Sequence, residues 1–179
     1  MSPQHPADCR LDRLFARELA VLQRCNGASL PLLAQDLFRL ASRLGDGVFW
    51  YGLMAALPAS EGRAALPAVL HMAGAGLIGT ALYKWLKAAT ERPRPYQACA
   101  AIPCLGAPLD RFSFPSGHTL HAVVFSAVAS AYYPALAWLV WPFTLLVALS
   151  RLVLGLHYPT DVVVGALLGG AVALATLLL

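Results

Sequence analysis

Charged residues are scarce in this chain. Only 12% of the 179 residues are Asp, Glu, Lys or Arg, whereas 59% are apolar and the mean hydropathy is +0.64. Soluble domains average about a quarter charged residues, so this composition excludes an ordinary soluble domain, a disordered chain and a coiled coil. The basic residues are scattered and the net charge is only +4, so no nucleic-acid partner is expected.

Cysteine is also scarce, with four residues in the whole chain. No spacing of Cys or His matches a metal site, so we expect neither a metal nor another cofactor. Cys99 and Cys104 are near enough in sequence to form a small disulfide if their loop lies outside the cell, whereas Cys9 and Cys25 suggest no pairing.

The apolar residues form long uncharged runs. Residues 162–179 carry no charge, and at 1.5 Å per residue they nearly cross a hydrocarbon core about 30 Å thick. The uncharged run 122–150 is too long for one helix and is broken at Tyr132-Tyr133-Pro134. We therefore predict an all-α, polytopic membrane helix bundle with about five spans, near residues 46–60, 64–84, 117–133, 135–154 and 160–179.

The first 45 residues have a different pattern. They contain six Arg and four acidic residues, and apolar residues recur at helical spacing between residues 11 and 22. This pattern indicates an amphipathic helix, with a second one around residues 32–44. Their apolar faces either contact lipid or pack on the loops of the bundle. We predict two regions: an interfacial N-terminal region, 1–45, and a transmembrane domain, 46–179.

The distribution of positive charge predicts the topology. If the first two spans form a hairpin through the short turn at 61–63, every Lys and Arg except Arg63 lies on one face. The positive-inside rule makes that face cytoplasmic.

Three cations come from separate parts of the chain but from the same predicted face. They are Lys87, Arg94 and Arg151. Converging cations suit a phosphate group, because Arg donates to its oxygens in pairs and Lys acts as a point charge. The two prolines around Arg94 restrict the backbone that presents it. Lys84 and Arg92 are interpreted as residues at the membrane interface that contribute to the membrane topology.

A helix is predicted to begin at Ser116. Ser116 is a good N-cap, Gly117 lets a ligand approach the backbone, and the free N–H groups of a helix start attract an anion. His118 then lies in the first turn beside that anion. His121 and His71 are interpreted as histidines that pack between helices.

A turn separates His157 from Asp161. Such a turn can bring the Asp161 carboxylate to one ring nitrogen of His157, which fixes the tautomer and leaves the other nitrogen as a nucleophile or base. Arg151 lies six residues upstream, where it can hold the phosphate that His157 attacks.

These three clusters resemble the signature of the type 2 phosphatidic acid phosphatase family, K-x6-R-P, P-S-G-H and S-R-x5-H-x3-D. The matching segments are 87–95, 115–118 and 150–161, with no departure at the fixed positions. The resemblance covers roughly residues 80–165 and leaves the first 45 residues unmatched. Familiar bacterial members are similar to six-span proteins with the site outside, whereas five spans are predicted here.

The resemblance implies a metal-independent hydrolase of phosphate esters or anhydrides. His157 would attack phosphorus to form a phosphohistidine, Asp161 would orient His157, and His118 would protonate the leaving oxygen and then activate water. Five further residues would bind the phosphate oxygens: Lys87, Arg94, Ser116, Gly117 and Arg151.

The substrate implied by the resemblance is a lipid phosphate, with its apolar part among membrane lipids. The candidates are phosphatidic acid, phosphatidylglycerophosphate, polyprenyl diphosphate, lipid A and, for a cytoplasmic site, a polyprenyl-phosphosugar phosphate. The expected location is a bacterial cytoplasmic membrane, with several spans and the active site on the cytoplasmic face. No feature of the sequence predicts an oligomeric state.

Two other functions are weighed against a hydrolase. The same residues bind vanadate in haloperoxidases, but those relatives are large and soluble. An inactive scaffold that binds lipid or a partner should have lost His157, His118 or Arg151, and this chain retains all three.

Overall fold

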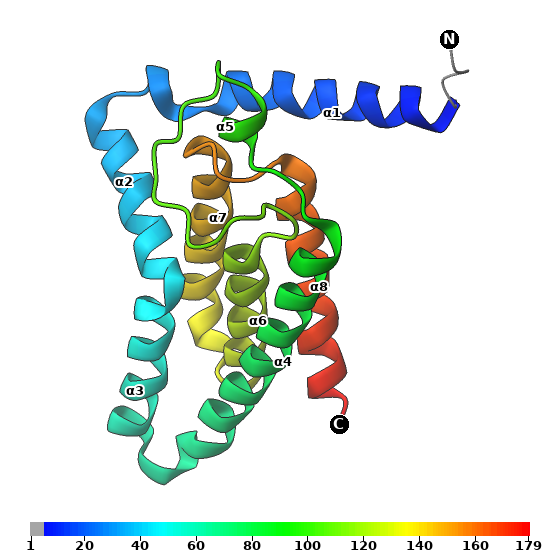
Figure 1. Cartoon of the computed structure of the whole chain (residues 1–179). Coiled ribbons are helices and arrows are strands. Elements are labelled where there is room, and N and C mark those ends of the chain that lie inside the picture. Colours follow the sequence, from blue (N-terminus) through cyan, green and yellow to red (C-terminus); the bar gives the residue numbers. More distant parts are fainter. Residues whose placement is uncertain (1–5) are drawn as a thin grey trace.

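The computed structural model describes residues 6–179, with side chains for 15–27 and 29–179, and this part contains helices and no strand. The α-helices, shown in Figure 1, are α1 (Pro6–Cys25), α2 (Leu32–Arg43), α3 (Phe49–Glu61), α4 (Leu66–Thr90), α5 (Pro95–Ala98), α6 (Gly117–Tyr132), α7 (Ala137–Val153) and α8 (Pro159–Leu177). Four short helical turns join them: η1 (Gly27–Ser29), η2 (Leu44–Val48), η3 (Gly62–Ala65) and η4 (Pro134–Leu136).

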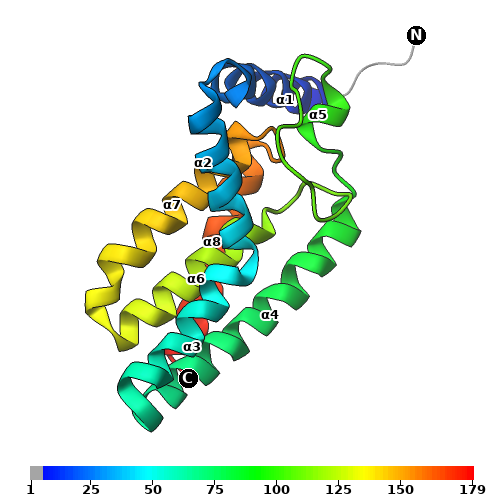
Figure 2. The same ribbon diagram turned by 90° about the vertical axis from the view of Figure 1, so that its left-hand side faces the viewer.

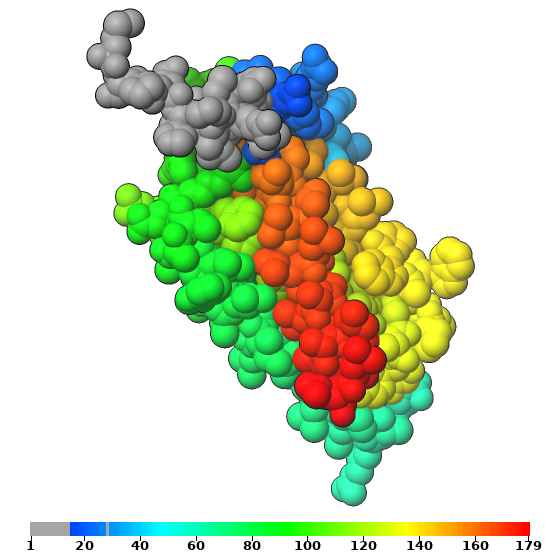
Figure 3. All heavy atoms as spheres, turned by 90° about the vertical axis from the view of Figure 1, so that its right-hand side faces the viewer, coloured from blue at the N-terminus to red at the C-terminus, as the bar shows by residue number. Residues whose placement is uncertain are grey.

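Helix α6 is the centre of the bundle. It packs against α4, α7 and α8, and most of its uncharged residues are buried, including Leu120, Val124 and Val128. In Figure 3, α8 runs between α4 and α7 on one face of the molecule. Since α6 is surrounded in this way, residues at its N-terminus are held by several neighbouring elements.

Helices α2 and α3 form one column with a break between them. The chain passes from α2 into α3 through the π-helical turn η2, where Asp46 and Gly47 depart from helical geometry and Gly47 has φ +123°. Only glycine adopts such a φ at low cost. Helix α2 packs directly against α7 (Figure 2), and the boundary predicted at residues 45/46 falls inside η2.

Helix α1 lies across one end of the bundle (Figure 1). Phe15, Leu19 and Leu22 pack against Ile102 and Tyr158, and the ring centroids of Phe15 and Tyr158 are 5.4 Å apart. This half of α1 thus contacts the protein's own loops. The side chains before Phe15, with the apolar positions predicted there, lie outside the described residues.

Three segments of the described chain are long and apolar enough to cross a membrane by length and composition. They are Leu32–Ala98, Pro134–Val153 and Pro159–Leu177. Helix α6 has 16 residues, about 24 Å at 1.5 Å per residue, and is shorter than a usual span. The number of spans therefore stays a prediction.

Candidate active site

A cavity of about 750 Å³ opens among α3, α4, α6 and the loop before α6. Six of the eight predicted site residues line this one cavity: Lys87, Arg94, Gly117, His118, Arg151 and His157. The other two, Ser116 and Asp161, lie behind it and contact the elements that carry the histidines. The fold thus brings together residues from three separate segments.

His157 lies in the turn between α7 and α8. Its backbone N–H donates to the Arg151 carbonyl at 3.1 Å, and the side chain is buried. Nδ1 lies 3.5 Å from Oδ2 of Asp161, and Nε2 lies 3.5 Å from Nη1 of Arg94. Because the Tyr158 N–H donates to the same Asp161 oxygen at 2.9 Å, the carboxylate is fixed behind the ring. Nε2 therefore faces the cations.

The surroundings of His157 keep its imidazole neutral. Burial lowers the pKa of His157 well below the ordinary value of 6.5, and the positive charges of Arg151, Arg94 and Lys87 lower the pKa further. A neutral imidazole retains the lone pair that a nucleophile needs.

An aspartate in the loop before α6 pairs with two of the predicted cations. Oδ2 of Asp110 is 2.6 Å from Nζ of Lys87, and Oδ1 is 2.7 Å from Nη2 of Arg94. Burial by itself raises the pKa of Asp110, but the hydrogen bond from Lys87 and the charges of Lys87 and Arg94 outweigh this, so that the pKa is lowered. The sequence analysis missed Asp110, although it is the one acidic residue between Glu91 and Asp161.

Arg94 is fixed by its backbone neighbours as well. The side chain is 1% exposed, Nη1 donates to the Leu156 carbonyl at 2.7 Å, and Nε donates to the Asp110 carbonyl at 3.1 Å. A buried guanidinium held at three nitrogens can present its charge in only one direction.

Arg151 has one buried nitrogen without a hydrogen-bond partner in the described part of the chain. Arg151 lies in the last turn of α7 with its side chain 1% exposed, and Nη1 donates to the hydroxyl of Ser42 on α2. Its Nε has no hydrogen-bond partner within the described part of the chain. A buried donor without a partner is costly, and an anion bound in the cavity would satisfy it.

The start of α6 has the geometry expected of a capped helix. The Ser116 hydroxyl accepts from the Thr119 N–H at 3.5 Å, and the Ser116 N–H donates to the Asp161 carbonyl at 3.0 Å. This second bond joins the two histidine-bearing segments.

A second carboxylate that the sequence analysis missed faces His118. Oδ1 of Asp46 lies 3.5 Å from Nε2 of His118. The break at Gly47 turns Asp46 out of the helical path, so neither a motif nor helical periodicity pointed to it.

The interpretation of Arg92 as an interfacial residue is wrong. Its Nη1 lies 2.6 Å from Oδ1 of Asp161, and its guanidinium lies 3.9 Å from the centroid of the Tyr158 ring. A separation of 69 residues hid this contact from pattern analysis.

The remaining histidines and cysteines make other contacts. Nε2 of His121 lies 3.0 Å from the Thr80 hydroxyl, and Nδ1 of His71 lies 3.2 Å from the Tyr132 hydroxyl, as packing between helices predicts. The thiols of Cys25, Cys99 and Cys104 are free. Within residues 15–27 and 29–179, no three His, Cys, Asp or Glu side chains gather as metal ligands do.

Comparison with known families identifies the family of this chain. The profile of the PAP2 superfamily matches residues 64–179, about two thirds of the chain. The chain belongs to the PAP2 superfamily. Its N-terminal helices lie outside the matched segment.

Two solved structures of the superfamily resemble the whole fold. LpxE of Aquifex aeolicus matches with a TM-score of 0.78 at 28% identity, over 90% of this chain and 94% of that one. A transmembrane PAP2-type phosphatidylglycerolphosphate phosphatase of Bacillus subtilis matches with a TM-score of 0.75 at 24% identity, over 92% of this chain and 84% of that one. Together with the apolar helices, these neighbours show that this PAP2 protein is a membrane protein.

One curated relative is more similar in sequence over a shorter stretch. The decaprenylphosphoryl-5-phosphoribose phosphatase of Mycolicibacterium smegmatis is 47% identical over 83 residues. That stretch is 45% of this chain and 42% of the relative, so the match spans less than half of the relative's length.

Proposed function

We propose that this PAP2 protein is an integral-membrane phosphatase that hydrolyses a phosphomonoester or diphosphate of a lipid. The observation that carries the proposal is the single cavity that Lys87, Arg94, Gly117, His118, Arg151 and His157 line. Three cations and a neutral imidazole in one cavity suit phosphoryl transfer, which depends mainly on positioning and charge stabilisation.

In the proposed mechanism His157 is the nucleophile. Nε2 attacks phosphorus while Asp161 holds the proton on Nδ1, and the P–O bond to the lipid breaks. His118 gives its proton to the leaving oxygen and then removes a proton from water, which cleaves the phosphohistidine and releases inorganic phosphate. Oδ1 of Asp46, 3.5 Å from Nε2 of His118, is placed to orient that imidazole.

The phosphate oxygens are bound by groups that the fold holds in place. Lys87, Arg94 and Arg151 supply the charge, and the N-terminus of α6 supplies the Gly117 N–H behind the Ser116 cap. This division of roles needs no metal: the cationic cavity repels a divalent cation, and we expect activity to persist in EDTA.

The rest of the cavity suits a hydrocarbon chain. Its lining continues with Trp50 and Met54 of α3, Leu77 of α4 and Phe125 of α6. A phosphate at the polar end thus has an apolar surface beside it, as a lipid substrate requires.

A polyprenyl-phosphosugar phosphate is the first substrate to test. The 47% identical stretch in the mycobacterial phosphatase supports this choice. Phosphatidylglycerophosphate, another of the candidate substrates, is the second lipid to test. A panel of these two lipids with phosphatidic acid, polyprenyl diphosphate and lipid A, assayed in detergent for phosphate release, tests the proposal. Release from none of the five would refute it.

The nucleophile is tested by His157→Ala. We expect a loss of roughly 10³-fold or more in kcat, because the covalent route is removed. His71→Ala is the matched control, since His71 contacts Tyr132 and does not line the cavity. Substantial turnover by a folded His157→Ala protein would contradict the mechanism.

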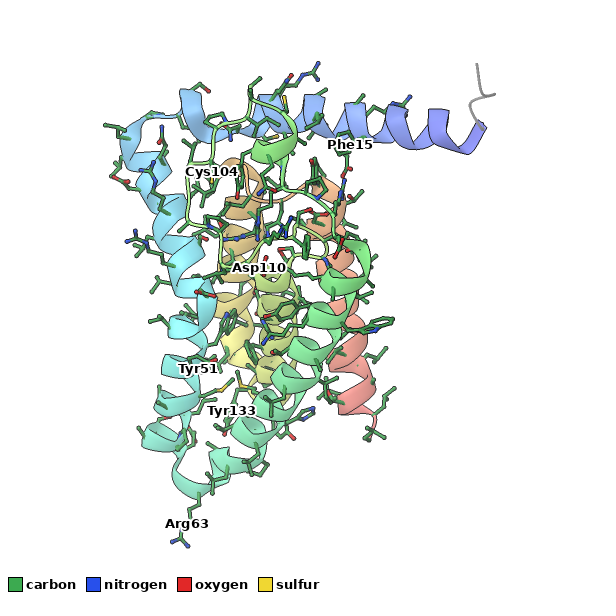
Figure 4. All side chains as sticks on the ribbon, viewed as in Figure 1. Phe15, Tyr51, Arg63, Cys104, Asp110 and Tyr133 are labelled. Atoms are coloured by element: carbon green, nitrogen blue, oxygen red, sulfur yellow. The ribbon has the colours of Figure 1, made fainter. Side chains whose placement is uncertain are left out.

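We further propose that the active site faces the cytoplasm in a cytoplasmic membrane. The support is the charge distribution, with Arg63 at the end of the bundle opposite Cys104 and Asp110 (Figure 4). In intact cells, an impermeant thiol reagent should label Arg63→Cys and should leave Cys104 unlabelled until the cells are permeabilised. Labelling of Cys104 in intact cells would place the site outside.

A further inference from the structure

Arg92 lies directly behind Asp161 and outside the cavity. Its Nη1 is 2.6 Å from Oδ1 of Asp161, whereas the other carboxylate oxygen, Oδ2, accepts from the Tyr158 N–H and lies 3.5 Å from His157. Arg92 does not line the cavity, and neither does Asp161. The guanidinium therefore acts on the carboxylate from the side away from any bound phosphate.

A residue of α1 holds the other end of the same guanidinium. Oε2 of Glu18 lies 2.5 Å from Nη2 of Arg92, and Oε1 accepts from both the N–H of Thr160, at 2.9 Å, and its hydroxyl, at 2.6 Å. Thr160 precedes Asp161 in the first turn of α8. Glu18 thus fixes Arg92 and the start of α8 together.

The aromatic ring of Tyr158 completes the support. The Arg92 guanidinium lies 3.9 Å from the centroid of the Tyr158 ring, and the ring of Phe15 of α1 lies 5.4 Å from the same ring. The side chain of Arg92 is 20% exposed and that of Glu18 is 12% exposed, so water screens this pair less than it screens a surface pair.

We propose that Arg92 is a positioning residue for the Asp161–His157 pair, and that Glu18 makes helix α1 a functional part of the active site. Two carboxylates on the two terminal nitrogens leave the guanidinium one orientation, and this orientation fixes the Asp161 carboxylate behind the imidazole. The inference rests on the proposed function, because it assigns a step to His157.

The proposal predicts a loss in kcat with little change in KM. Arg92→Ala should lower kcat about 10- to 100-fold, the range typical of residues that orient a functional group, and leave KM within about threefold. Glu18→Gln should lower kcat by a smaller factor, and Arg92→Lys should recover most of the loss, because a cation returns to Asp161. Arg17→Ala is the matched control, since Arg17 is exposed on α1 beside Glu18.

A charge-swap variant tests whether the Glu18–Arg92 ion pair positions Asp161 or only holds α1 against the loop. The double variant Glu18→Arg with Arg92→Glu restores an ion pair between α1 and the loop but places a carboxylate beside Asp161. Positioning predicts that kcat stays low in this protein, whereas a merely structural tie predicts that kcat recovers. Recovery of kcat, or an Arg92→Ala protein that raises KM at unchanged kcat, would overturn the proposal.

Binding of inorganic phosphate distinguishes this inference from the proposed function. Phosphate should raise the unfolding temperature of Arg92→Ala as much as that of the wild type, because Lys87, Arg94 and Arg151 are unchanged. A wild-type protein that releases no phosphate from any lipid refutes the proposed function. An active wild type with an unimpaired Arg92→Ala refutes only the inference.

Discussion

Asp110 neutralises part of the positive charge that the proposed substrate needs. Its two oxygens lie 2.6 Å from Lys87 and 2.7 Å from Arg94, distances that phosphate oxygens would also adopt. The carboxylate and a phosphate therefore compete for the same donors.

Asp110→Asn should strengthen the binding of inorganic phosphate about tenfold, because a charge-assisted contact no longer has to be displaced. Phosphate-dependent shifts of the unfolding temperature would measure this. Glu91→Gln, an exposed carboxylate at the end of α4, is the control. Weaker phosphate binding by Asp110→Asn would mean that Asp110 holds the two cations in place and does not compete for them.

His157 should make stability depend on pH. Its pKa is lower in the folded protein than the unfolded value near 6.5, since burial and then the charges of Arg151, Arg94 and Lys87 oppose protonation. Below pH 6.5 the unfolded chain thus binds one more proton, and stability falls as pH falls, by about 1.4 kcal/mol per pH unit for that proton.

His157→Gln should remove this contribution. Between pH 7 and pH 5 its unfolding temperature should fall less than that of the wild type, whereas His71→Gln should follow the wild type. Parallel curves for His157→Gln and the wild type would show that the imidazole is protonated in the folded protein.

At the scale of elements, two glycines set how closely α8 approaches α6. A Cβ at position 169 would lie 2.5 Å from the Leu120 carbonyl oxygen, and one at position 165 would lie 2.6 Å from the Ser116 carbonyl oxygen. Both oxygens belong to the backbone, so neither can move without shifting the start of α6. A Cβ at Gly170 would meet nothing within 4 Å.

Gly165→Ala and Gly169→Ala should each destabilise the protein by about 1–3 kcal/mol, the usual cost of overpacking, and should lower kcat. Gly170→Ala should be neutral or slightly stabilising, because alanine favours a helix. Thermal unfolding and phosphate release would measure both effects. Unchanged stability in Gly169→Ala would show that the contact between α6 and α8 is looser than the structure has it.

At the scale of the whole molecule, α3 and α4 diverge from their connection toward the site (Figures 1 and 2). The cavity lies along this divergence, with Ala73 and Leu77 of α4 on one side and Tyr51 and Met54 on the other. A lipid chain can therefore lie between the two helices while its phosphate reaches His157.

Ala73→Phe should obstruct that path. We expect KM for a long-chain lipid phosphate to rise at least about tenfold, and hydrolysis of water-soluble p-nitrophenyl phosphate to stay unchanged. Ile78→Phe is the control, because Ile78 is 52% exposed and does not line the cavity. Equal effects on both substrates would place the lipid chain elsewhere.

Much of the site could be predicted because short motifs carry it. Within each motif only a few residues separate the site residues, and helix ends and turns fix their local geometry. The three motifs are Lys87 to Arg94, Ser116 to His118, and Arg151 to Asp161. Four other residues were not predicted to belong to the site, because their partners are distant in sequence. They are Asp46, Asp110, Glu18 and Arg92, the last of which was interpreted as interfacial. Glu18 and Arg92, for example, are separated by 74 residues, and no local pattern links them.

Composition and hydropathy were sufficient for the helical membrane architecture, because apolar runs of this length are stable only when their backbone groups are hydrogen-bonded within helices. The division into an N-terminal region and a transmembrane domain, made from the charge pattern, stays a prediction. Only the packed chain placed α2 beside α7, brought Asp110 onto the cations and linked Glu18 of α1 to Asp161 through Arg92. These contacts form when several helices pack together, and the periodicity of apolar residues along one helix carries no information about them.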